Sequence, residues 1–146
     1  MAFTLKNVIA GDPISFRNTL VASNTIAATA TSTGTLVGLE RFSICDLHLI
    51  VSAASGTSPT LDVYIQKLLA DGTTWDDVGH FTQQTAAASN VMTLVAGNQA
   101  VHAQALRNVA SATIRTTHFG NTWRVDVVVG GTNPSFTWAL YGDFYS

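Results

Sequence analysis

The chain has 146 residues, of which 47% are hydrophobic and only 11% are charged, with a formal net charge of −2 and an isoelectric point near 6.0. This length and apolar fraction predict one domain with a buried core and argue against a disordered chain. The only lysines are Lys6 and Lys67, and the arginines are scattered along the sequence. No basic patch is therefore expected, which argues against nucleic acid as a partner.

Residues 1–18 lack a steady hydrophobic period, and the dipeptide Asp12-Pro13 interrupts them. For these reasons we expect an N-terminal arm here, with an ordinary first strand as the alternative. Such arms often become ordered only against a partner. The start has no basic region followed by an apolar core, which argues against a signal peptide. No stretch approaches the ~20 apolar residues of a membrane span, so no membrane contact is expected. With a single cysteine, Cys45, the composition predicts a protein made and folded in a reducing cytoplasm.

Strand signals fill residues 19–146, which we expect to form one β domain. In 41–52 apolar and polar residues alternate, although keeping Ile44 on the apolar face requires a bulge near Cys45. Within this apolar run, Cys45 is expected to be a small buried hydrophobic residue. Shorter strands are expected at 20–30, 91–95, 100–104 and 112–117.

The clearest alternation of apolar and polar residues lies in 61–67, which predicts a half-buried strand. The dipeptide Asp71-Gly72 follows soon after and is the strongest short signal for a hairpin turn. Residues 75–83 are therefore expected to return as the antiparallel partner of that strand.

Two further strands, 123–129 and 136–143, flank the expected turn Gly130-Gly131-Thr132-Asn133-Pro134. Trp123 and Trp138 are in phase with the apolar residues of these strands, so both are expected in the core. The total is about eight strands joined by short turns, with no internal repeat and no segment that offers a long crossover helix. The sequence therefore predicts an all-β fold, an antiparallel β-sandwich of jelly-roll or related Greek-key type.

Residue types that carry catalysis or bind metals form no recognised motif here. Glu40 is the single glutamate, and neither Gly-x-Ser-x-Gly nor His-Glu-x-x-His occurs. Asp71, Asp76 and Asp77 offer oxygens for Ca²⁺, but Asp71 begins a turn and the other two should point to opposite faces of a strand. The histidines are far apart and are expected to be polar strand positions: His48, His80, His102 and His118. We therefore expect no catalytic, cofactor-binding or metal-binding residue, and no enzyme.

The hairpin of residues 61–83 carries a resemblance to a known class of proteins. It reads Leu61-Asp62-Val63-Tyr64-Ile65-Gln66, then Asp71-Gly72-Thr73-Thr74-Trp75-Asp76-Asp77-Val78, then His80-Phe81-Thr82-Gln83. This pattern resembles a hairpin found in small structural proteins of tailed bacteriophages. The rest of the chain agrees with that class in style only, since it is short, Thr- and Ala-rich, sparsely charged and poor in cysteine.

The resemblance implies a virion structural protein, made in the host cytoplasm. The expected function is that of a capsid decoration (cement) protein, which binds the outer surface of an assembled phage head and stabilises it. Its expected partners are the major capsid protein and further copies of itself, as a homotrimer. Interfaces are depleted in Lys, Glu and Asp, which agrees with the low charge of this chain. A tail or head-completion component of the same kind of virus is the alternative.

An alternative of another class is a carbohydrate-binding β-sandwich module. Modules of this size bind sugars through exposed aromatic side chains, and the candidates are Trp75, Trp123, Trp138, Tyr64 and Tyr141. The expected core positions of Trp123 and Trp138 argue against this function for those two residues.

Overall fold

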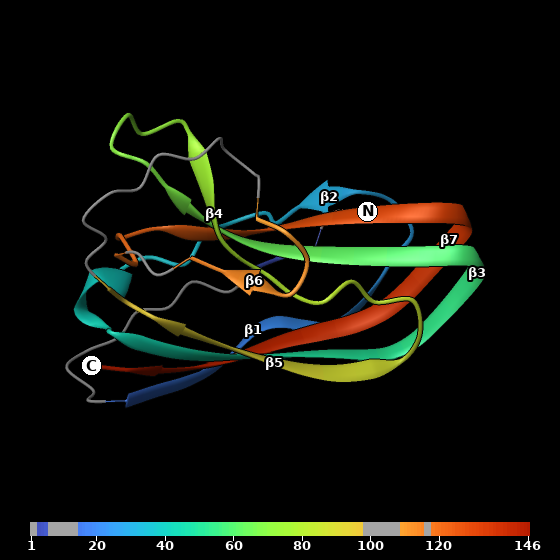
Figure 1. The fold of residues 1–146 in the computed structure, drawn as a ribbon, viewed down its shortest axis with the longest axis horizontal. Coiled ribbons are helices and arrows are strands. Elements are labelled where there is room, and N and C mark those ends of the chain that lie inside the picture. The colour runs from blue at the N-terminus through green and yellow to red at the C-terminus, as the bar shows by residue number, and fades with distance from the viewer. Residues whose placement is uncertain (1–2, 6–14, 98–108, 116–117) are drawn as a thin grey trace.

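The computed structural model describes residues 3–5, 15–97, 109–115 and 118–146 (Figure 1). These residues form an all-β antiparallel sheet with seven strands and one short 3₁₀ helix, Leu39–Arg41, and the sheet is not closed. The strands are β1 (Ser15–Ile26), β2 (Ala30–Thr31), β3 (Ile44–Leu68), β4 (Trp75–His80), β5 (Ala88–Val95), β6 (Thr113–Ile114) and β7 (Trp123–Tyr145). The expected all-β antiparallel architecture is confirmed. The strand expected at 100–104 lies outside the described residues.

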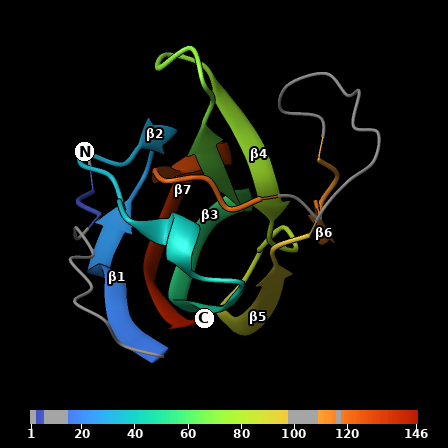
Figure 2. The ribbon, with the colours of Figure 1, turned by 90° about the vertical axis from the view of Figure 1, so that its left-hand side faces the viewer.

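The sheet is built on two very long strands, β3 and β7, which pair from Ile44 opposite Tyr145 to Lys67 opposite Trp123. Both strands bend near their middle, at one end of the molecule, so that the sheet folds back over itself (Figures 1 and 2). We call the part with β1, β5 and residues 44–55 and 135–145 the β5 half. The part with β2, β4, β6 and residues 60–68 and 123–130 is the β4 half.

The prediction of separate strands on either side of residues 53–58 and 130–134 is wrong. These segments pair with one another through register shifts, so that β3 and β7 each remain a single bent strand. The bend contains a short internal repeat, which the expectation of no repeats missed: Gly56-Thr57-Ser58-Pro59 and Gly131-Thr132-Asn133-Pro134.

The two copies of the repeat face each other across the bend, with Thr57 opposite Thr132. Gly56 and Gly131 have φ angles of 110° and 106°, which L side chains rarely adopt. A Cβ on either glycine would lie 2.6 Å from a carbonyl oxygen of the other copy. Glycine is therefore required in both strands, because only it allows the two backbones to approach this closely.

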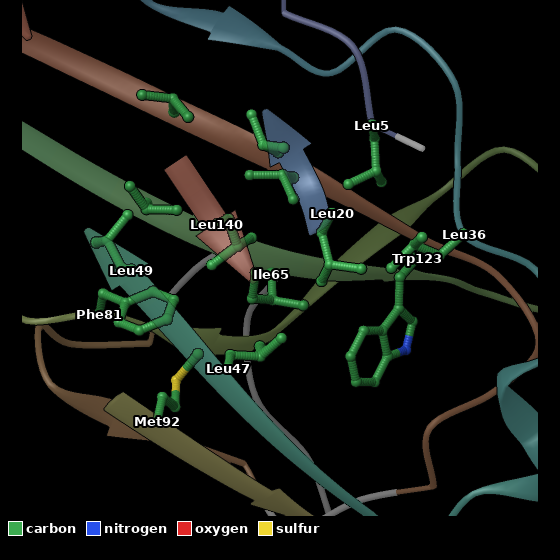
Figure 3. Packing of buried hydrophobic residues seen from close by; sticks show 14 of the residues in the cluster. Leu5, Leu20, Leu36, Leu47, Leu49, Ile65, Phe81, Met92, Trp123 and Leu140 are labelled. Carbon is green, nitrogen blue, oxygen red and sulfur yellow. The ribbon is translucent and has the colours of Figure 1, made fainter. Parts of the chain in front are cut away.

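The hydrophobic core lies between the two halves of the sheet. Leu47 and Leu49 point into it from the β5 half and Ile65 from the β4 half (Figure 3). Trp123 and Trp138 are 1% and 0% exposed, which confirms their predicted core positions.

Cys45 is also fully buried, as expected, but the bulge predicted beside it is absent. The β3–β7 register runs without a shift from Ile44 to Val51, and Ile44 points outward with 39% of its surface exposed. The core face of this part of β3 therefore begins at Cys45, so no extra residue is needed to keep it in phase.

Two parts of the 1–18 segment are described. Residues 15–18 belong to β1, which pairs with the end of β7. Phe3 and Leu5 are buried, and the ring of Phe3 packs edge-on against Trp138 with centroids 5.0 Å apart. The Leu5 amide donates to the carbonyl of Thr33 at 3.0 Å. The expectation that residues 1–18 form an N-terminal arm stays a prediction.

Candidate functional site

The outer face of the β4 half is polar but buried. Leu61, Val63 and Ile65 point into the core, so the alternate residues of β3 point outward. Those outward residues and their neighbours on β4 and β7 are nevertheless at most 9% exposed: Asp62, Gln66, Asp77, His80 and Asp126. Buried polar groups need partners, and on this face Asp62 binds His80 while Gln66 binds Asp77.

His80 is the centre of one of these groups. Its Nε2 lies 2.9 Å from Asp62 Oδ1, its Nδ1 lies 3.1 Å from the carbonyl oxygen of Val109, and its ring stacks on Tyr64 with centroids 4.0 Å apart. Gln83 Nε2 donates to the other oxygen of Asp62 at 2.7 Å. Both ring nitrogens and both carboxylate oxygens are therefore engaged within the fold, which is the arrangement of a structural link rather than of a base facing a substrate.

A second group lies on the same face, toward the β3–β4 turn. Gln66 Nε2 donates to Asp77 at 2.8 Å, and Gln66 Oε1 accepts from Arg124 Nε at 2.7 Å. The guanidinium of Arg124 lies 4.5 Å from the ring centroid of Trp75, a cation–π contact. Trp75 is thus held by Arg124 and does not project freely into solvent.

The three aspartates weighed as a Ca²⁺ site have separate partners. Asp76 pairs with Arg115, and Asp77 accepts from Gln66 on the opposite face. Asp71 accepts hydrogen bonds from the side chain and backbone of Thr74 and from the backbone of Thr73, which lower its pKa to about 2. The structure therefore does not bring these carboxylates together.

The histidines are also dispersed. His48 lies in the β5 half, His80 in the β4 half and His118 on the surface, while His102 lies outside the described residues. Within the described part of the chain, no group of three or more His, Cys, Asp or Glu side chains is arranged to hold a metal ion.

The outer face of the β5 half is open to solvent, and we call it the β5 face. Its residues form rows across neighbouring strands because β5, β3 and β7 are in direct register: Val95, Ile44 and Tyr145; Thr93, Asp46 and Asp143; Val91, His48 and Tyr141. The apolar members are exposed, from 37% for Tyr141 and Tyr145 to 68% for Val91. Large exposed apolar side chains that cluster on one face are typical of a binding surface.

A groove of about 760 Å³ runs over this face. Six of its lining residues are Asp46, His48, Val91, Thr93, Tyr141 and Asp143. Thr93 Oγ1 donates to Asp46 at 2.6 Å, His48 Nε2 lies 2.5 Å from Ser89 Oγ, and the rings of His48 and Tyr141 are 6.3 Å apart.

The thiol of Cys45, which precedes Asp46 in β3, is fully buried. Burial, and then the charges of Asp46 and Asp143, raise the pKa of Cys45 well above its usual value. The thiol is thus kept protonated and is not a nucleophile.

No sequence motif marks this groove. Only Tyr141 among its residues was named as a candidate, for sugar binding. One local signal was present, since the outward positions of strand 44–51 include the apolar residues Ile44 and Ile50 where a solvent-exposed face is normally polar. The other aromatic candidates are less available, because Trp123 and Trp138 are buried and Tyr64 stacks on His80.

Comparison of the chain with known protein families, with curated proteins and with solved structures gives no match. The described residues include no helix with the length and apolar character to cross a bilayer. The candidate function therefore rests on the geometry of the β5 face and on the sequence of the 61–83 hairpin.

Proposed function

We propose that the chain is a virion structural protein, a capsid decoration (cement) protein that binds the outer surface of an assembled phage head and stabilises it. The observation that supports binding is an apolar patch at one end of the β5 face, formed by Ile44, Val95 and Tyr145, which are 39%, 48% and 37% exposed. These three residues lie side by side on neighbouring strands. The resemblance of the 61–83 hairpin to phage structural proteins supports the virion assignment.

The proposed mechanism is mechanical. Copies of the chain, as a homotrimer, bridge neighbouring major capsid subunits and bury apolar surface across the junctions. A specific interface of standard size buries about 1,600 Å² in total, so several such contacts would hold the trimer on the capsid without covalent bonds. No catalytic residue, cofactor, nucleic acid or membrane takes part. In this proposal the bent sheet is a jelly-roll or related Greek-key sandwich, which the single core enclosed by its two halves supports.

The test compares two isoleucines of similar exposure on different halves of the sheet. Ile44 in the apolar patch is 39% exposed, and Ile114 on β6 is 41% exposed. Undecorated capsids are mixed with wild type, Ile44→Ser or Ile114→Ser, and the bound fraction is measured by sedimentation. Loss of a central apolar contact costs more than about 1 kcal/mol, so Ile44→Ser should weaken binding about fivefold or more, while Ile114→Ser should bind as wild type does.

Two further measurements complete this test. Free major capsid subunits should bind poorly, because each offers only part of the contact area. Light scattering of the pure protein should report a multiple of 15.4 kDa, with three copies expected. Equal binding by both variants would exclude the apolar patch as the interface. Failure of the folded wild type to bind capsids would exclude a decoration protein and favour the alternative, a tail or head-completion component.

A further inference from the structure

The groove of the β5 face differs from the neighbouring apolar patch because it combines an aromatic ring with hydrogen-bonding side chains. Tyr141 presents 37% of its surface there. The carboxylates of Asp46 and Asp143 lie beside it in the next row, on paired positions of β3 and β7, with Thr93 at the edge. We propose that this groove binds a neutral saccharide.

The chemistry of a sugar ring matches this combination. A pyranose has an apolar face of C–H groups, which packs on an exposed aromatic ring, and a rim of hydroxyls that both donate and accept hydrogen bonds. Ionised carboxylates accept at about four positions each, and threonine hydroxyls donate and accept. The volume of about 760 Å³ falls within the ~300–1,000 Å³ of small-molecule sites.

A cation fits the groove less well than a neutral ligand does. Thr93 already donates to Asp46, and Asp143 also has an interaction within the chain. A neutral hydroxyl uses the acceptor positions that remain without displacing these groups.

A purely apolar ligand is also disfavoured. Covering Asp46 and Asp143 with hydrocarbon would remove water from two carboxylates without replacing its hydrogen bonds, which is costly. The groove therefore selects a ligand that is apolar on one side and rich in hydroxyls on its rim. This inference is independent of the virion assignment, and it requires only the β5 face.

The experiment uses the full chain labelled with ¹⁵N and four separate probes: maltotriose, cellotriose, tri-N-acetylchitotriose and lactose. At least one probe should shift the amide signals of residues 46–48, 91–93 and 141–143 in a saturable way. Tyr141→Ala should weaken that binding about tenfold or more, because it removes the stacking surface, and Asp46→Asn should weaken it by a smaller factor. Thermal unfolding checks that both variants remain folded.

Tyr145→Ala is the matched control. Tyr145 lies on the same strand and face and is also 37% exposed, but it does not line the groove. Its loss should leave saccharide binding unchanged and, if the apolar patch is the capsid interface, should weaken capsid binding instead. The proposal is overturned if none of the four probes shifts these signals, or if Tyr141→Ala and Tyr145→Ala have equal effects. Saturable binding of Nα-acetyl-lysine amide in place of the sugars would also overturn it, since the groove would then be a cation site.

Discussion

The outer faces of the β4 half and the β5 half are built from the same kind of strand but differ in how much of their outward side chains is exposed to solvent. In the β4 half, outward residues such as Asp62 and His80 are buried and bind one another. In the β5 half, outward residues such as Val91 and Tyr141 remain exposed and line a groove. Alternation along a strand therefore predicts which side chains point away from the core, but it does not predict whether those side chains are exposed to solvent.

On the β4 half, residues 109–115 lie along β4, where β6 forms the edge of the sheet, and they supply a partner to His80. Residues 109–115 are tied to β4 and the loop after it by hydrogen bonds that include those from His80 Nδ1 to the Val109 carbonyl, from the Gln83 amide to Ser111 and from the Arg115 amide to the Val78 carbonyl. Polar groups on the β4 half therefore serve stability. The open β5 face is the part of the described surface on which we place binding.

The largest effect on the free energy of unfolding is expected in the core that the two halves share. The effects of substitutions on the two outer faces can be compared with it. Replacing Trp138 by Ala should lower the free energy of unfolding by ~3–5 kcal/mol, as for other fully buried aromatic residues. Tyr141→Ala, on the outward face of the same strand, should change it by only about 0.5 kcal/mol. Denaturant unfolding of both variants measures the contrast. A similar small change in both would mean that Trp138 does not support the core.

The comparison between the two faces is tested by one aspartate from each. Asp62→Ala leaves the buried ring of His80 without its carboxylate partner, which should cost about 1–3 kcal/mol. Asp46→Ala removes a half-exposed carboxylate whose partner Thr93 remains open to water, so stability should change by about 0.5 kcal/mol or less. Equal losses of stability would contradict the division into a structural face and a binding face.

Much of the fold could be predicted because it depends on short-range patterns of apolar and polar residues. Period-2 alternation placed the 61–67 strand, and the phase of Trp123 and Trp138 placed both in the core. The continuity of β3 and β7 could not be predicted in this way. Their Gly-Thr-Ser-Pro and Gly-Thr-Asn-Pro segments have the composition of turns, and only their pairing with each other keeps them in the sheet.

The candidate site was harder to predict than the fold. Asp46, Thr93 and Asp143 come from three strands far apart in the sequence, and they meet only because of the register between those strands. Local sequence does not encode such register across distant strands. The burial of Asp62 has the same origin, since its partners His80 and Gln83 come from beyond the next turn.

The smallest effect is expected at Asp71, in the β3–β4 turn outside both faces, which provides a baseline for the comparison. Hydrogen bonds from Thr74 and Thr73 favour the ionised carboxylate and lower its pKa from 3.8 to about 2. Because the folded-state pKa is depressed, its contribution is present above pH 3.8 and is lost as the pH falls through about 2. An NMR titration of the Asp71 carboxyl should therefore have its midpoint near 2, and Thr74→Val, which removes the side-chain hydrogen bond, should move it toward 3.8. A midpoint of 3.8 in the wild type would show that these hydrogen bonds do not stabilise the ionised carboxylate of Asp71. The turn itself would remain possible in that case, because Gly72 can adopt its φ of 71° without them.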